Sequence, residues 1–204
     1  LATPDSCPLP DPYWAFYWPG GQALTRFLLD NENIVRGSAV LDFGSGCGSA
    51  SMACISGAAK RVLMNDIDQN ALLAAKLNLR LNNMSGADVQ YTDTNLLESQ
   101  EVHSMILNLY GDVPSSSRLL LLGDMFYDSE FADSVFKWLK RVKNEFGVSI
   151  LVGDPDRHPL NEEKILQGYS TGFSKNRLAS YALPGYVTRE HYGFTSGHVY
   201  QIEF

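Results

Sequence analysis

Short apolar runs alternate with longer amphipathic stretches along most of the chain, beginning at Ser38. Apolar runs of this length, bounded by polar or glycine residues, are typical of buried strands. Five of them predict strands in succession, and two further runs near the C-terminus predict an antiparallel pair. The seven predicted strands span residues 38–43, 61–68, 87–93, 118–124, 148–154, 177–185 and 197–204.

The stretches between these runs carry helical periodicity. Small residues dominate 49–59, and Leu72, Ala75 and Leu79 share one face of a helix predicted over 69–83. A third helix is predicted over 130–147, with Asp128 or Ser129 as its N-cap and Gly147 at its end. Its residues at helical spacing are Phe131, Val135, Trp138, Leu139 and Val142. Because Trp138 falls in the middle of this stripe, we expect it to lie in the core.

Alternation of strands and helices predicts an α/β fold of the Rossmann-like type. We expect a seven-stranded, mostly parallel sheet with helices on both faces. Ligands of such sheets bind at the carboxyl ends of the strands, which places Asp66, Asp93 and Asp124 along one rim. We expect residues 1–37 to form an N-terminal segment with an aromatic lid and a helix, and 38–204 to form the core of a single domain. Within the segment 96–117, a short helix is predicted around 102–109.

Composition excludes several classes of protein. The chain has 204 residues, 45% hydrophobic and 19% charged, which suits one globular core. A formal net charge of −7 argues against a nucleic-acid partner, whose phosphates need clustered Lys and Arg. No apolar stretch approaches the roughly 20 residues of a membrane span. Cys7, Cys47 and Cys54 lack the spacing of a zinc site, so no metal is expected.

The turn "GSGCG" after the first strand predicts a nucleotide cofactor. Gly44, Gly46 and Gly48 alternate there, and Ser45 lies between the first two. Glycine permits a tight turn and lets a ligand approach the backbone. Asp66 closes the next strand about 20 residues further on, where a carboxylate can accept both ribose hydroxyls.

Two cofactor classes use this arrangement. A nicotinamide site would have a third glycine where this chain has Ser49, and no Tyr-x-x-x-Lys pair of a short-chain dehydrogenase occurs. S-adenosylmethionine fits better, because Asp42 precedes the turn and can meet the amino acid moiety. Asp93 at the third strand tip can accept from an adenine amino group, or it is a turn residue. A nicotinamide-dependent reductase and an inactive cofactor-binding module remain the alternatives.

Several blocks together resemble the lysine methyltransferases of the electron transfer flavoprotein beta subunit, within the seven-β-strand protein methyltransferases. The blocks are "PYWAFYWPGGQALTRFLLDN", "VLDFGSGCGSASMACISGA", "NDIDQNA", "LLLLGDMFYD" and "ILVGDP". The resemblance implies a protein-lysine methyltransferase acting on that beta subunit, with Trp18 close to the cofactor. It further implies the mitochondrial matrix, with the cytoplasm as the alternative. Ribosomal protein methyltransferases share the glycine turn and are the nearest competitors. Residues 96–117 look longer than the family's linker, and little after Pro155 matches.

The stretch "GDMFYD" supplies the candidate catalytic residues. Methyl transfer to an amine is an in-line displacement, so positioning the amine matters most. Asp124 can hold the lysine ammonium, while Phe126 and Tyr127 form walls whose π faces attract a cation. The same stretch can serve only as a helix N-terminus, with Asp128 as the cap and the aromatic rings packed. Methyltransferases of base amino groups carry two prolines here, so that activity is disfavoured.

Overall fold

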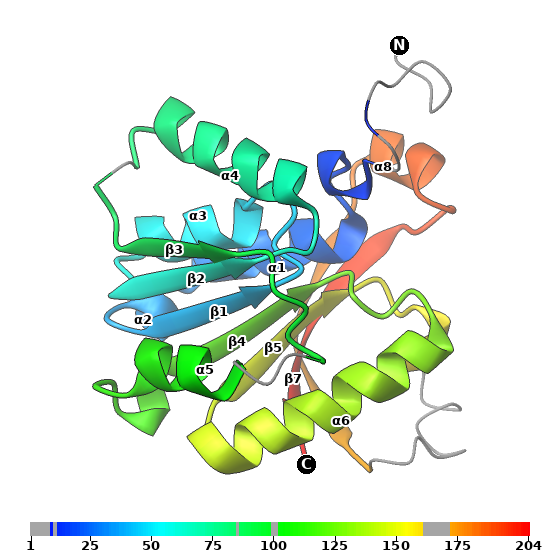
Figure 1. Cartoon of the computed structure of the whole chain (residues 1–204). Helices are drawn as coiled ribbons and strands as arrows, with labels where there is room; N and C mark the ends of the chain where they lie inside the picture. The colour runs from blue at the N-terminus through cyan, green and yellow to red at the C-terminus, as the bar shows by residue number, and fades with distance from the viewer. Residues whose placement is uncertain (1–8, 10–11, 85, 99–101, 161–171) are drawn as a thin grey trace.

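A single seven-stranded sheet runs through the chain in the order β3-β2-β1-β4-β5-β7-β6. The computed structural model describes residues 9, 12–84, 86–98, 102–160 and 172–204 (Figure 1). The first five strands pair in parallel, whereas β7 pairs antiparallel with β5 and with β6. The strands are β1 Ala39–Phe43, β2 Arg61–Asn65, β3 Val89–Thr92, β4 Arg118–Gly123, β5 Ser149–Asp154, β6 Ser174–Ala182 and β7 Ser196–Glu203. The predicted fold class and the C-terminal antiparallel pair are therefore confirmed.

Helices cover both faces of the sheet (Figure 1). On one face lie α1 Pro19–Asp30, α3 Ser49–Ser56 and α4 Gln69–Leu81, and on the other lie α5 Val102–Tyr110 and α6 Ser129–Phe146. Shorter elements are α2 Glu32–Val35, α8 Gly185–Glu190 and three 3₁₀ turns at Tyr13–Ala15, Ser115–Ser117 and His158–Leu160. The helix predicted around 102–109 is confirmed as α5, whereas α8 has no counterpart among the predicted elements.

Local chemistry sets the ends of the helices. The Asp68 side chain accepts a hydrogen bond from the backbone N–H of Asn70 at the start of α4. Asp128 does the same for Phe131 at the start of α6, which confirms one of the two predicted caps. Gly147 ends α6 in the left-handed conformation, with φ of 63°, where a residue without Cβ is favoured.

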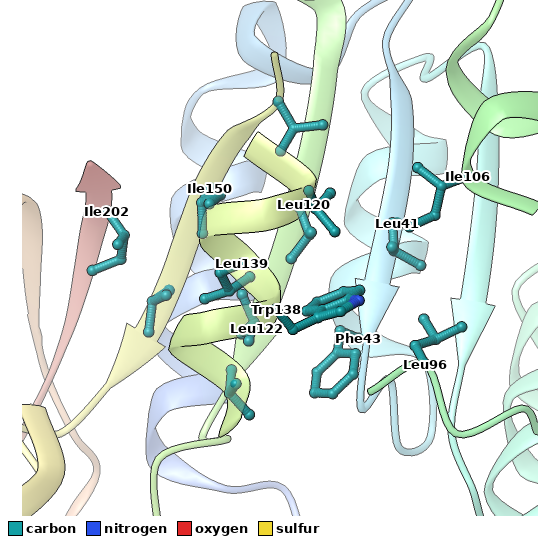
Figure 2. Packing of buried hydrophobic residues seen from close by; sticks show 14 of the residues in the cluster. Leu41, Phe43, Leu96, Ile106, Leu120, Leu122, Trp138, Leu139, Ile150 and Ile202 are labelled. Carbon is teal, nitrogen blue, oxygen red and sulfur yellow. The ribbon is translucent and has the colours of Figure 1, made fainter. Parts of the chain in front are cut away.

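Trp138 confirms its predicted place in the core. It is 3% exposed, and its ring centroid lies 4.9 Å from that of Phe43. Figure 2 shows Trp138 reaching from α6 toward Phe43 of β1, among aliphatic side chains of the sheet. Since Phe43 is the last residue of β1, this contact anchors α6 next to the glycine turn that follows.

Two glycines let α1 lie directly on the strand ends. A Cβ atom on Gly153, at the end of β5, would overlap the backbone of Gly20 in the first turn of α1. The absence of both side chains brings the N-terminus of α1 against the ends of β4 and β5. Backbone N–H groups of α1 thereby reach the rim of the sheet.

Some predictions fall outside the described residues. Cys7 lies there, as do most of the residues before Pro12 and residues 99–101 of the segment 96–117. In the part of the chain that the structure describes, no helix has the length and apolar character needed to cross a membrane.

Candidate active site

A cavity of about 1490 Å³ lies at the carboxyl ends of β1, β2 and β4. Most of its lining comes from five parts of the chain: the aromatic segment before α1, the glycine turn, residues 65–68, residues 95–98, and the stretch after β4. Side chains of α6 close one side. This is the rim at which the sequence predicts ligand binding, and the site residues discussed below lie on it or next to it.

The glycine turn adopts a conformation that favours glycine at three positions. Gly44, Gly46 and Gly48 have φ of 66°, 52° and 85°. Ser45 lies between them, and its backbone N–H donates to the carbonyl of Asn65 at 2.8 Å, which fastens the turn to β2. Gly44, Ser45 and Gly46 line the cavity. Gly48 does not; it starts α3, and a Cβ there would lie 3.0 Å from Cβ of Ala75, so it serves helix packing.

Asp66 braces the same turn from the end of β2. Its Oδ2 accepts from the backbone N–H of Gly46 at 2.9 Å, and its Oδ1 accepts from that of Asp68 at 3.0 Å. Burial raises the pKa of this carboxyl group. Each carboxylate oxygen has two lone pairs, so each retains one for a ligand in the cavity.

Asp42 lies beneath the turn and lines the cavity as well. Its Oδ2 accepts from the backbone N–H of Ser51 at 3.1 Å and from the Ser51 hydroxyl at 2.6 Å. The side chain is almost fully buried, and burial raises its pKa to about 6. Asp42 therefore fixes the start of α3 while presenting part of its carboxyl group to the cavity.

Asp93 lies away from the cavity, contrary to its predicted contact with a cofactor. Its carboxylate accepts from the Gln69 side chain at 2.6 Å, in a separate depression of about 340 Å³. The Asn65 side-chain amide donates to the carbonyls of Thr92 and Thr94 and holds that segment along β2. The chain consequently reaches the cavity only at Asn95.

Asp124 occupies the predicted strand tip but is already engaged on both oxygens. Its Oδ2 accepts from the backbone N–H groups of Gly20 and Gly21, the latter at 3.3 Å. Its Oδ1 accepts from Nε of Arg157 at 2.7 Å. Asp124 has φ of 59° and is 6% exposed. Burial raises the pKa of its carboxyl group, and the positive charge of Arg157 opposes that rise.

The two aromatic residues after Asp124 separate. Tyr127 is 61% exposed, stacks on Phe131 with centroids 5.2 Å apart, and lines the cavity. Phe126 points the other way: it is fully buried and stacks on Phe136 at 4.8 Å. The prediction of a cavity wall at Phe126 is corrected accordingly, because apolar packing against α6 takes up this ring.

Trp18 and its aromatic neighbours form one side of the cavity, as the predicted lid would. Trp18 precedes α1, its Nε1 donates to the carbonyl of Tyr13 at 2.8 Å, and its ring lies 4.9 Å from that of His191. Phe16 and Tyr17 line the same side.

Arg157 is the site residue that the sequence patterns do not single out. It lines the cavity and pairs with Asp124, yet it follows β5 in a segment without periodicity. The last matched block, "ILVGDP", stops two residues before it. A basic residue so near a strand tip is the one signal that could have indicated it.

Several features of the cavity suit a polar nucleotide cofactor. Three buried polar atoms without a hydrogen-bond partner belong to lining residues: Ser45 Oγ, Trp14 Nε1 and Trp138 Nε1. Such atoms are costly unless a ligand satisfies them. Together with the free lone pairs of Asp66 and the exposed backbone of the turn, they match a molecule rich in hydroxyl and amino groups. Among the described residues, no group of His, Cys, Asp and Glu could hold a metal ion.

Comparisons with known proteins point to methyltransferases. Residues 22–113 match the family described as "Ribosomal protein L11 methyltransferase (PrmA)". The "Electron transfer flavoprotein beta subunit lysine methyltransferase homolog" of Caenorhabditis elegans is 52% identical over 204 residues, which are 100% of this chain and 83% of that protein. The Xenopus laevis "Electron transfer flavoprotein beta subunit lysine methyltransferase" is 43% identical, over 98% of this chain and 73% of that protein.

A solved structure supports the same fold. Magnesium protoporphyrin IX methyltransferase from Synechocystis PCC 6803, with bound SAM, superposes with a TM-score of 0.58 at 16% identity. The match covers 89% of this chain and 77% of that one. At this level of identity the likeness concerns the fold alone, which is the class I methyltransferase fold.

Proposed function

Because this chain belongs to the family of electron transfer flavoprotein beta subunit lysine methyltransferases, we propose that it methylates lysine side chains of that beta subunit with S-adenosylmethionine as the donor. One observation carries the proposal: relatives with this name match the chain over almost its whole length. The cavity described above lies where ligands of this fold bind, which agrees with it. Gly44 to Gly46, Asp66, Asp124 and Tyr127 all line this cavity. We assign the glycine turn and Asp66 to the cofactor, as the cofactor end, and Asp124 and Tyr127 to the acceptor lysine, as the acceptor end.

The first end suits the cofactor. The backbone of Gly44 to Gly46, the carboxyl groups of Asp42 and Asp66, and the Ser45 hydroxyl are the groups that would hold it. When bound, S-adenosylmethionine supplies a methyl group on a positively charged sulfur; the amine lone pair forms the new C–N bond while the C–S bond breaks with its electrons left on sulfur. The chain's own contribution is to hold donor and acceptor in line.

The second end suits a lysine side chain. The exposed ring of Tyr127 lines the cavity, and an aromatic face attracts an ammonium group as it enters. Lysine has a pKa near 10.4, so supplying the neutral amine at neutral pH costs about 3 to 5 kcal/mol unless the site lowers that pKa. Removal of the amine from water inside the cavity favours its neutral form.

We also propose a cellular location for the protein. The sequence blocks that resemble the family support the mitochondrial matrix. The cytoplasm is the alternative, and fractionation of cells that express the full-length protein distinguishes the two.

The test is methylation of purified proteins. The chain is incubated with labelled S-adenosylmethionine in two separate reactions, one with the flavoprotein beta subunit and one with ribosomal protein L11. Labelled lysines are then located by mass spectrometry. Label on lysines of the beta subunit is expected. Label on L11 alone would assign the chain to the competing activity. Asp66→Asn serves as the variant with impaired cofactor binding.

A further inference from the structure

An ion pair lies inside the acceptor end of the cavity. The Arg157 side chain is 13% exposed, that of Asp124 is 3% exposed, and Nε and Oδ1 are 2.7 Å apart. The guanidinium carbon lies 5.8 Å from the Trp18 ring and 5.3 Å from the Phe194 ring. The Arg157 backbone N–H donates to Asp154 at 2.6 Å. Backbone and side chain are thus both fixed, with the positive charge at the cavity lining.

Asp124 without Arg157 would work against methyl transfer. A buried carboxylate next to an incoming ammonium group stabilises the charged form and raises the pKa of the amine. The reaction requires the neutral amine, since only its lone pair can attack. A positive charge paired with that carboxylate cancels most of the effect, because the pair as a whole carries no net charge.

We propose that Arg157 is a positioning residue that neutralises Asp124, so that the acceptor lysine binds next to a compensated carboxylate and loses its proton near neutral pH. This inference rests on the proposed lysine methyltransferase function. Asp124 still accepts a hydrogen bond from the amine through a remaining lone pair, which orients the nitrogen. Arg157 itself acts through Asp124 and does not need to touch the substrate.

Other charged groups near the pair leave this arrangement intact. The titratable residues on the surrounding elements are Tyr127, Asp154, Asp156, Lys175, His191 and His198. Burial raises the pKa of Asp154 well above its usual range, with Asp124 adding to the rise, so Asp154 competes little for the charge of Arg157. Asp156 is engaged by the Tyr200 hydroxyl and by Lys175 at 3.3 Å.

A matched pair of substitutions tests the proposal. Arg157→Gln removes the charge and keeps a hydrogen-bond donor, whereas Arg157→Lys keeps the charge. For Arg157→Gln we expect the acidic limb of the kcat profile to move up by about one pH unit, with kcat about tenfold lower near neutral pH and restored at alkaline pH. KM should not rise, because the ammonium form binds an uncompensated Asp124. Arg157→Lys should keep the limb of the parent enzyme.

A second readout does not depend on turnover. With S-adenosylhomocysteine bound, calorimetry in two buffers of different ionisation enthalpy counts the protons released when the flavoprotein beta subunit binds. Arg157→Gln should release fewer protons than the parent chain. Aminoethylcysteine in place of the target lysine has a less basic amine, so it should restore activity of Arg157→Gln near neutral pH.

The outcomes separate two failures. A parent chain that leaves the beta subunit unmethylated sinks the proposed function. The role of Arg157 alone is overturned if the parent is active, if kcat of Arg157→Gln is reduced equally at every pH, and if aminoethylcysteine does not restore it. If Arg157→Gln does not fold, Arg157→Met keeps the apolar stem between Trp18 and Phe194 and is held to the same criteria.

Discussion

Asp66→Asn should weaken cofactor binding without unfolding the protein. Asp66 accepts one backbone N–H on each carboxylate oxygen, from Gly46 and from Asp68, and each oxygen keeps one lone pair toward the cavity. Asn has the same shape but no charge, and one of its two terminal atoms is a donor. That donor necessarily faces a backbone N–H group, so one brace of the turn and one ligand contact are lost together.

Typical hydrogen-bond energies give the size of the effect. Hydrogen bonds to a charged group contribute about 1.5 to 3 kcal/mol each; the substitution removes one such ligand contact and turns the other into a weaker bond to a neutral amide. A net loss of about 2 to 3 kcal/mol corresponds to roughly 30- to 150-fold weaker binding of S-adenosylhomocysteine. Asp66 is only half-buried, so we expect a much smaller effect on the free energy of unfolding.

Calorimetric titration with S-adenosylhomocysteine is the assay, and Asp93→Asn is the matched control. The sequence predicts an adenine contact for Asp93, whereas the structure places it in a separate depression with Gln69. Asp93→Asn should therefore bind S-adenosylhomocysteine as the parent chain does. Equal affinity of Asp66→Asn and the parent, or an equal loss in Asp93→Asn, would refute the placement of the ribose at Asp66.

Three further substitutions test the site and its support. Asp124→Asn should spare S-adenosylhomocysteine binding but lower kcat by at least about 100-fold, because the amine is no longer positioned. The same substitution should lower the free energy of unfolding by about 3 kcal/mol, because it leaves Arg157 unpaired. Gly153→Ala should cost about 2 to 3 kcal/mol in urea unfolding because its Cβ overlaps the backbone of α1, whereas Gly86→Ala, with open space around it, should cost little. Asp42 has a pKa raised by burial to about 6, from 3.8, so its stabilising contribution is full below the unfolded value and is lost as pH rises through 6. That change amounts to about 3 kcal/mol, and Asp42→Asn should flatten the dependence of unfolding free energy on pH between about pH 4 and 7 by this amount.

Each of these expectations has an outcome that contradicts it. Loss of S-adenosylhomocysteine binding in Asp124→Asn would remove the division between the two ends of the cavity. Equal stability of Gly153→Ala and Gly86→Ala would mean that α1 can shift away from β5 at no cost. An unchanged pH dependence in Asp42→Asn would show that another buried carboxyl group, such as Asp154, dominates that range.

The succession of strands and helices along the chain could be predicted from the sequence because its signals are local. Apolar runs of strand length alternate with amphipathic stretches at the places where the structure has strands and helices. The side chain of Asp128 caps the start of α6, and Gly147 ends the helix in the left-handed conformation. The helix α8 could not be predicted in this way. It has six residues, of which Val187 alone is buried, and so carries no periodic signal.

Site contacts that follow from the pairing of strands could be predicted from the sequence, whereas those decided by individual side-chain contacts could not. Gly46 and Asp66 are 20 residues apart and follow the ends of the adjacent strands β1 and β2, so their hydrogen bond follows directly from parallel pairing. Asp93 lies at its strand tip as expected, but side-chain hydrogen bonds of Asn65 decide which residue after β3 reaches the cavity. Phe126 and Tyr127 are neighbours, and only packing against Phe136 decides which of them faces inward.

The acceptor end depends on contacts that no local pattern encodes. Asp124 meets Gly20 across 104 residues and Arg157 across 33, so its environment exists only once α1 has docked on β4 and β5. The cofactor end, in contrast, is built from one turn and the adjacent strand tip. Substitutions after β5 can therefore change how the amine is received while the hydrogen bonds of the glycine turn stay in place. Substitutions on α1 act on both ends, because the Thr25 hydroxyl on this helix also donates to the Ser49 hydroxyl at the start of α3.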